Sequence, residues 1–201
     1  TRDYEIDANL FQHGETFSPQ KEHTLILGWN QLGFQILGEL DHYVPEGSSL
    51  TVVSDFSLTD KDASKFNSQD LRQSCTFQQG DTSDRQTLES LPLDNFENII
   101  LLAYSDKLSA KQADARTLMT LLHLRDIADK QGYRFSLISE VLDVRNRELA
   151  KAARVDDFIV SDRLISLILS QISEHKFLGA VFEDLLNPEG SEIYLKPASL
   201  Y

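Results

Sequence analysis

Short apolar runs alternate along this chain with segments in which apolar residues recur every three or four positions. The runs lie at residues 24–27, 49–54, 74–78, 98–103, 134–139 and 157–160. Apolar runs of this length predict strands, and the longer spacing predicts one face of a helix. Strands that alternate with helices form a parallel sheet with helices on both faces. The pattern therefore predicts an α/β fold with a Rossmann-like, doubly wound parallel sheet.

Helical patterns fill most of the intervals between these runs and continue beyond the last one. Helices are predicted at residues 31–43, 57–70, 109–130, 143–153, 162–176 and 180–186. A further helix carries Leu88 and Leu91, and Asp81 or Thr82 would cap it. Asp162 would cap the helix that follows the last strand.

The pattern divides the chain into four segments. Residues 1–22 form a polar lead-in or linker, residues 23–161 form the Rossmann-like lobe, residues 162–178 hold one amphipathic helix, and residues 179–201 begin a small C-terminal lobe with a strand at 191–196. The chain starts at Thr1 and not at a methionine. We therefore expect a processed product or a fragment of a longer protein.

The first predicted strand runs directly into a glycine turn. Dinucleotide-binding folds carry Gly-x-Gly-x-x-Gly here. The first glycine makes the tight turn, the second lets the backbone approach the pyrophosphate, and the third lets the helix pack on the strand. Gly28 and Gly33 occupy the first and third places, and Asn30 occupies the second. We therefore expect the turn geometry to be kept, whereas Asn30 argues against a pyrophosphate site.

Acidic residues follow two of the predicted strands. Asp55 comes directly after the second strand, about 20 positions beyond the glycine turn, where a dinucleotide site hydrogen-bonds a ribose hydroxyl. Capping of the next loop explains Asp55 equally well. Asp81 follows the third strand, at the edge of the sheet where doubly wound folds bind ligands, although helix capping is the simpler role.

The helix predicted at residues 162–176 is apolar on more than one face. A helix of this kind must be buried more completely than a surface helix. At the end of a Rossmann-like sheet, the simplest way to bury it is against a partner chain. The apolar positions at helical spacing are Leu164, Ile165, Ile168, Leu169 and Ile172.

Composition excludes several classes of function. The 201 residues carry a net charge of −13, which argues against a nucleic-acid partner because phosphate binding needs a basic patch. The longest apolar runs are too short to span a bilayer, which takes about 20 residues. A single cysteine, Cys75, excludes an internal disulfide framework and fits a reducing compartment.

The sequence gives no positive evidence for an enzyme. It contains no Gly-x-Ser-x-Gly nucleophile elbow, no Walker loop, and no histidine or cysteine spacing typical of a metal site. Serine residues are plentiful, but none stands in a recognisable catalytic pattern.

Four separated stretches are similar to one family of membrane proteins. They lie at residues 23–30 (HTLILGWN), 115–126 (ARTLMTLLHLRD), 142–150 (LDVRNRELA) and 188–197 (PEGSEIYLKP). The chain resembles the CASTOR/POLLUX ion-channel family over residues 23–198, and more broadly the RCK (regulator of potassium conductance) and TrkA-N domains. The resemblance implies a cytosolic regulatory domain that senses a ligand and couples it to the opening of a cation-channel pore.

The resemblance also implies partners and a location. Residues 23–161 would be the N-terminal lobe of an RCK domain, and residues 162–178 would hold the crossover helix through which two copies pair. The intact protein would form a tetrameric or octameric gating ring joined to its own membrane pore domain. This part would lie at the cytoplasmic face of the membrane and would not be an enzyme.

Calcium is the ligand that fits the acidic composition and the wider group of resembling domains. Calcium takes about six to eight oxygen ligands. The candidates are Asp55, Asp81, Asp84 and Glu140, which lie near the ends of predicted strands. Binding of NAD is disfavoured because Asn30 replaces the second glycine.

Two other interpretations stay open. A soluble NAD-binding oxidoreductase or nucleotide sensor is favoured by Gly28, Gly33 and Asp55, and opposed by Asn30 and by the missing catalytic acid or base. A structural Rossmann module with an empty cleft would serve only in assembly. The residues that would hold a nucleotide are Gly28, Asn30, Gly33, Asp55 and Asp81.

Overall fold

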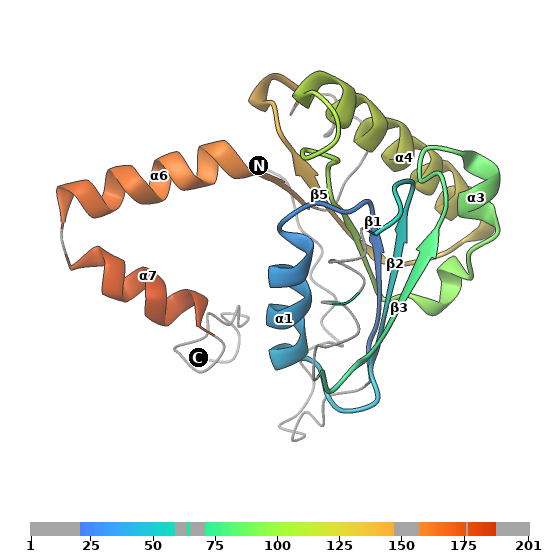
Figure 1. Cartoon of the computed structure of the whole chain (residues 1–201), viewed down its shortest axis with the longest axis horizontal. Coiled ribbons are helices and arrows are strands. Elements are labelled where there is room, and N and C mark those ends of the chain that lie inside the picture. Colours follow the sequence, from blue (N-terminus) through green and yellow to red (C-terminus); the bar gives the residue numbers. More distant parts are fainter. Residues whose placement is uncertain (1–20, 59–63, 65–70, 147–156, 176, 188–201) are drawn as a thin grey trace, which may run out of the picture.

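A computed structural model of the chain describes residues 21–58, 64, 71–146, 157–175 and 177–187. Their strands form one sheet with helices on both of its faces (Figure 1). Most of the helix predicted at residues 57–70, most of the one at 143–153 and the strand at 191–196 lie outside the described residues.

Six parallel strands form the sheet in the order β3-β2-β1-β4-β5-β6. β1 lies in the middle of the sheet, and β2 and β3 follow it outward on one side. β4 lies against the other side of β1, and β5 and β6 follow it outward on that side. This order brings the carboxyl ends of the strands to one edge, and the winding reverses between β1 and β4. The strands are β1 (His23–Leu27), β2 (Ser49–Ser54), β3 (Ser74–Gln79), β4 (Asn98–Leu101), β5 (Ser136–Val141) and β6 (Asp157–Val160).

Helices cover both faces of the sheet. In Figure 1, α1 lies on one side of the sheet, whereas α3 and α4 lie on the other. Among the described residues, no helix combines the length and the apolar character needed to cross a membrane. The helices are α1 (Gly33–Tyr43), α3 (Arg85–Glu89), α4 (Ala110–Gln131), α6 (Ser161–Glu174) and α7 (Leu178–Leu186), with short 3-10 turns η2 (Leu93–Asn95) and η3 (Val144–Asn146).

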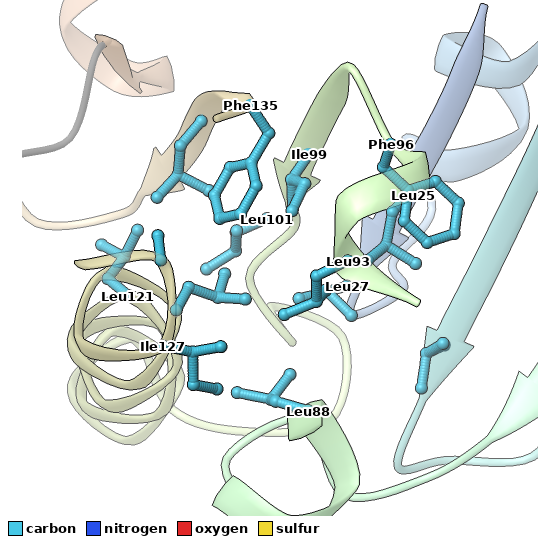
Figure 2. Packing of buried hydrophobic residues seen from close by; sticks show 14 residues of the cluster. Leu25, Leu27, Leu88, Leu93, Phe96, Ile99, Leu101, Leu121, Ile127 and Phe135 are labelled. Carbon is cyan, nitrogen blue, oxygen red and sulfur yellow. The ribbon is translucent and has the colours of Figure 1, made fainter. Parts of the chain in front are cut away.

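Alternate residues of β1 contribute to two separate cores. Leu25 and Leu27 belong to the cluster beneath α3 and α4, whereas Ile26 belongs to the cluster beneath α1. Successive side chains of a strand point to opposite faces of the sheet, so an apolar run is buried on both sides. Figure 2 shows the first cluster, to which α4 contributes Leu121 and Ile127.

The predicted doubly wound sheet is confirmed, and the limits of several elements differ slightly from the prediction. β4 ends at Leu101 and not at residue 103, and β5 runs two residues later than expected. The reason is that the ladder between these strands begins with the pair Asn98–Ser136. α6 begins at Ser161, so Asp162 lies inside this helix and does not precede it.

One predicted helix cap was wrong. The sequence predicts Asp81 or Thr82 as the cap of the helix after β3, but Asp84 caps α3, because Thr87 N donates to Asp84 Oδ2 at 3.0 Å. Asp81 instead accepts a hydrogen bond from Arg116 of α4. The two acidic residues after β3 therefore have different roles: Asp84 caps α3, and Asp81 binds Arg116 at the edge of the sheet.

The two C-terminal helices α6 and α7 extend away from the sheet (Figure 1). α6 contacts α7 and β6, and these contacts cover only part of its apolar surface. Between 49 % and 62 % of the area of each of Leu164, Ile165, Leu167 and Leu169 is exposed, whereas Ile168 and Ile172 are partly buried.

We expect Gly28→Ala to destabilise the fold. Gly28 has a φ of +91°, and a Cβ on it would lie 2.1 Å from the carbonyl oxygen of Leu102. A left-handed backbone costs other residues about 1–2 kcal/mol, and overpacking costs about 1–3 kcal/mol more. The free energy of unfolding, measured by urea denaturation, should therefore fall by roughly 2–5 kcal/mol.

Gly38→Ala is the matched control for this prediction. Gly38 lies within α1, and a Cβ there would meet no other atom within 4 Å. Alanine in place of a helical glycine should raise the free energy of unfolding by about 0.5–1 kcal/mol. If both substitutions changed stability by similar amounts and in the same direction, the close approach at Gly28 would be contradicted.

Candidate functional site

The turn after β1 passes close to β4, at the point where the winding of the sheet reverses. Gly28 N donates to Val53 O at 2.9 Å, and Leu102 N donates to Leu27 O at 2.9 Å. Because the Leu102 carbonyl occupies the place that a Cβ of Gly28 would need, this turn requires a glycine at its first position. The sheet edge around this turn holds most of the residues that the sequence singles out.

Asn30 is turned into the protein and is only 3 % exposed. Its Nδ2 donates to the Ala103 carbonyl oxygen at 2.8 Å and to Glu140 Oε2 at 2.9 Å. Its Oδ1 accepts from Leu32 N at 3.0 Å. The side-chain amide therefore connects the turn between β1 and α1 to the ends of β4 and β5.

Glu140, at the end of β5, is the partner that completes this connection. It is 8 % exposed, and its Oε2 accepts a second hydrogen bond, from Ala103 N at 3.0 Å. A buried carboxylate is costly unless it accepts hydrogen bonds, and Asn30 and Ala103 supply two of them. Glu140 is thus part of the framework at the switch point.

Trp29 covers the third glycine of the turn. A Cβ on Gly33 would lie 2.7 Å from the Trp29 ring, so the missing side chain leaves room for the indole. The ring packs edge to face on Phe34, with centroids 5.1 Å apart, and on Phe77 of β3, with centroids 6.5 Å apart. Gly33 therefore permits an aromatic cluster between β1, α1 and β3.

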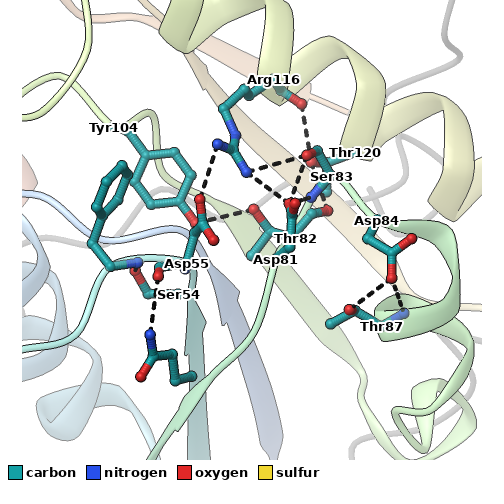
Figure 3. A network of polar contacts seen from close by, with 12 residues as sticks. Ser54, Asp55, Asp81, Thr82, Ser83, Asp84, Thr87, Tyr104, Arg116 and Thr120 are labelled. Carbon is teal, nitrogen blue, oxygen red and sulfur yellow. Dashed lines mark hydrogen bonds and ion pairs between the residues drawn. The ribbon is translucent and has the colours of Figure 1, made fainter.

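Arg116 of α4 bridges the two acidic residues that follow β2 and β3. Its Nη1 lies 2.9 Å from Asp55 Oδ2, and its Nη2 lies 2.7 Å from Asp81 Oδ1 (Figure 3). Nη2 also donates to Ser83 Oγ at 3.2 Å. The structure therefore brings Asp55 and Asp81 together through a cation that the chain itself supplies.

Tyr104 lies directly beneath this ion pair and is 3 % exposed. Its hydroxyl accepts from Asp55 N at 3.0 Å and is 3.0 Å from Thr82 Oγ1. The Arg116 guanidinium lies 5.5 Å from the centre of its ring, within range of a cation–π contact. Thr120 Oγ1 donates to Thr82 O at 2.9 Å, which fastens α4 to the same loop (Figure 3).

A small cavity lies among Leu27, Thr82, Tyr104 and Arg116. Its volume is about 10 Å³, which holds at most one water molecule.

The candidate calcium ligands do not form one group. Asp55 and Asp81 pair with Arg116, Asp84 caps α3, and Glu140 bonds to Asn30. Among the residues that the structure describes, no three His, Cys, Asp or Glu side chains are placed to hold a metal ion. This arrangement does not fit calcium, which needs about six to eight oxygen ligands.

α4 also fixes the turn that follows β5. Asp114, 1 % exposed, accepts from Leu142 N at 2.8 Å, from Asp143 N at 2.9 Å and from Asn146 Nδ2 at 2.7 Å. Two residues further along the helix, Arg116 holds the loops after β2 and β3. One helix therefore anchors the loops on both sides of the switch point.

Sequence reasoning missed Arg116, Tyr104 and Asp114. A basic residue in the helix after β4 carries no signal of its own, because its partners depend on how α4 crosses the sheet. Tyr104 directly follows the predicted fourth strand, and its position at the carboxyl end of a strand is the one signal that could have indicated a role.

Comparison with known proteins assigns the fold to a family. Residues 24–161 match the family model of the TrkA-N domain. The chain belongs to the TrkA-N family. The match runs from β1 to the start of α6, so the switch point, Asn30 and the Arg116 cluster all lie inside the TrkA-N domain.

Two curated relatives are named ion channels. The chain is 28 % identical over 214 residues to the probable ion channel CASTOR of Oryza sativa subsp. japonica and 29 % identical over 213 residues to the ion channel CASTOR of Lotus japonicus. Each match covers 90 % of this chain but only 24 % and 25 % of the two relatives. The chain thus spans about a quarter of the length of these channels.

A solved gating ring has the same fold. The human SLO3 gating ring superposes with a TM-score of 0.58 at 12 % identity, over 89 % of this chain and 31 % of that one. At this level of identity the likeness concerns the fold.

We expect Arg116→Ala to raise the pKa of Asp81. Burial favours a higher pKa for this carboxyl group, but hydrogen bonds from Ser83 and the charge and hydrogen bond of Arg116 together bring it below the ordinary 3.8. Without the guanidinium, only the hydrogen bonds from Ser83 oppose the rise in the Asp81 pKa that burial causes. The carboxyl carbon of Asp81 in an NMR titration should therefore report a higher pKa than in the unmodified protein.

The same substitution should change the pH dependence of stability. A carboxyl group whose pKa is lower in the folded state stabilises the fold above its unfolded pKa, and this stabilisation is lost as the pH falls through the folded pKa. Arg116→Ala should therefore lower the free energy of unfolding at pH 7 and have a smaller effect below pH 3.8. Arg85→Ala, which removes an ion pair with Asp126, is the control and should leave the pKa of Asp81 unchanged.

Proposed function

We propose that this TrkA-N domain is the ligand-responsive regulatory domain of a cation channel of the CASTOR/POLLUX type, and that it works as an oligomer. Its named relatives are ion channels that match 90 % of the chain, which supports a regulatory role and not a catalytic one. In the intact protein the domain would lie at the cytoplasmic face of a membrane, joined to the pore on the same polypeptide.

The exposed apolar surface of α6 is the observation that carries this proposal. Leu169 is 62 % exposed and Ile165 is 55 % exposed, and they lie four residues apart on one face of the helix. Monomeric soluble proteins rarely expose large contiguous apolar patches, and such patches mark interaction sites. α7 adds further exposed apolar residues, namely Val181, Leu185 and Leu186.

A second copy of the chain is the occupant that we propose for this surface. An apolar helix that projects from its own domain can bury its stripe against the same helix of another copy, and pairs related by a two-fold axis are the commonest way in which proteins associate. Such pairs would be the building blocks of a tetrameric or octameric ring in the intact channel.

Gating would then follow from a shift between two ring geometries. A ligand changes the balance between two states only by the difference between its affinities for them. In this chain α4 holds the loops after β2, β3 and β5 together, so the lobe would move as a rigid body. The movable parts would be the contacts that α6 and α7 make between copies.

Calcium is the first ligand to test for this function. The net charge of −13 supports attraction of cations. The proposal names no calcium ligands in this lobe, because Asp55, Asp81, Asp84 and Glu140 do not converge on one point. Calorimetric titration of the intact protein with calcium would show whether a saturable site exists elsewhere.

We expect Leu169→Asp to weaken self-association. A carboxylate in the apolar stripe of α6 would have to be buried unpaired in the dimer. Sedimentation equilibrium of the purified chain should give a dimer, and the variant should raise the dissociation constant at least about tenfold, which corresponds to 1.4 kcal/mol.

Leu122→Asp is the matched control for α6. Leu122 is 54 % exposed on the outer side of α4, so the new carboxylate has a similar local environment but lies outside the proposed interface. The dimer should therefore keep its affinity. A chain that stays monomeric at concentrations of about 100 μM, or a control that dissociates as readily as Leu169→Asp, would contradict the proposal.

The regulatory role itself is tested in the full-length protein. Ligand-dependent currents in planar bilayers should be reduced by Leu169→Asp and retained with Leu122→Asp, because only the first disturbs the pairing of copies. A full-length protein without channel activity, or with currents that ignore both substitutions, would overturn the proposed function.

A further inference from the structure

The crevice at the switch point keeps the outline of a dinucleotide site. Gly28 makes the tight turn, Gly33 allows close packing behind it, and Asp55 stands at the end of β2 where a ribose would bind. A bound nucleotide would lie along these residues.

We propose that the chain's own side chains occupy this crevice, and that Asn30 and Arg116 are the residues that exclude a dinucleotide. Asn30 blocks the pyrophosphate half and Arg116 blocks the ribose half. This inference does not depend on the proposed channel function.

The pyrophosphate half has fewer free donors than an open dinucleotide site. A pyrophosphate binds to backbone N–H groups at the start of the first helix. Here Leu32 N donates to Asn30 Oδ1 and Gly33 N donates to Asn30 O, both at 3.0 Å. Two of the N–H groups at this helix start are therefore already bonded to Asn30.

A negative charge lies behind these occupied donors. The Glu140 carboxylate is 2.9 Å from Asn30 Nδ2 and is almost fully buried. A pyrophosphate that displaced the Asn30 side chain would meet this carboxylate in a poorly hydrated site, where repulsion between like charges is strong. The second position of the turn thus excludes an anion both by its side chain and by the partner of that side chain.

The ribose half is closed by an ion pair. An acidic residue at the end of the second strand selects a nucleotide by accepting hydrogen bonds from ribose hydroxyls. Asp55 instead pairs with Arg116 at 2.9 Å, and Arg116 is held in turn by Asp81 at 2.7 Å. A ribose hydroxyl that bonded to Asp55 would have to displace the Arg116 guanidinium from this carboxylate and would separate an existing ion pair. The two halves of the crevice are therefore closed by different side chains, and the removal of one would leave the other closed.

Calorimetric titration of the purified chain with NADH, and separately with ADP, tests this inference. The unmodified protein should show no saturable binding up to about 1 mM of either nucleotide. The triple variant Asn30→Gly, Glu140→Gln and Arg116→Ala restores the second glycine, removes the buried charge behind it and frees Asp55. It should bind ADP or NADH at least about tenfold more tightly than the detection limit set by the unmodified protein.

The controls separate exclusion from misfolding. Arg85→Ala removes a different ion pair of the same surface and should gain no binding. Circular dichroism and urea denaturation establish that the triple variant is folded. If it does not fold, Asn30→Ala with Glu140→Gln and Arg116→Ala removes the same amide and the same charge without the backbone freedom of a glycine, and it should gain ADP binding instead.

Two results would overturn the inference. One is saturable NADH or ADP binding by the unmodified protein, with shifts of the Asn30 side-chain amide in its NMR spectrum. The other is a folded triple variant that binds neither nucleotide, because the exclusion would then not come from Asn30, its partner Glu140 and Arg116.

Discussion

The close approach of the β1–α1 turn to β4 is the constraint on which the rest of the sheet edge depends. With no side chain on Gly28, the turn lies against the Leu102 carbonyl. This contact carries Asn30 far enough over the sheet to reach Ala103 and Glu140. One glycine makes this contact possible.

A second set of contacts comes from α4. Its buried side packs on the sheet through leucine and isoleucine residues, and its polar residues hold three loops. Arg116 joins the loops after β2 and β3, whereas Asp114 joins the turn after β5. Both residues are charged, and both satisfy several partners, which is the condition under which buried or half-buried charge stabilises a fold. α4 therefore fastens the loops on both sides of the switch point.

Much of the fold, but only part of the site, could be predicted from the sequence. Strand and helix periods gave the parallel sheet, and the spacing of Gly28 and Gly33 gave the turn. The sequence shows that Asn30 departs from the dinucleotide pattern. Its hydrogen bond to Glu140 joins residues 110 positions apart, so no local sequence pattern could predict it. For the same reason Glu140 and Asp84 were grouped with Asp55 and Asp81. All four lie near strand ends in the sequence, whereas in space Asp84 turns to a helix cap and Glu140 to Asn30.

The aromatic cluster at the glycine turn has a practical consequence. The chain contains a single tryptophan, and that residue is Trp29, packed over Gly33 between Phe34 and Phe77. The intrinsic ultraviolet emission of the protein above the tyrosine band therefore comes from one half-buried indole at the switch point of the sheet. The fluorescence of Trp29 should therefore change with any event that moves this turn, and no attached label is needed to follow it.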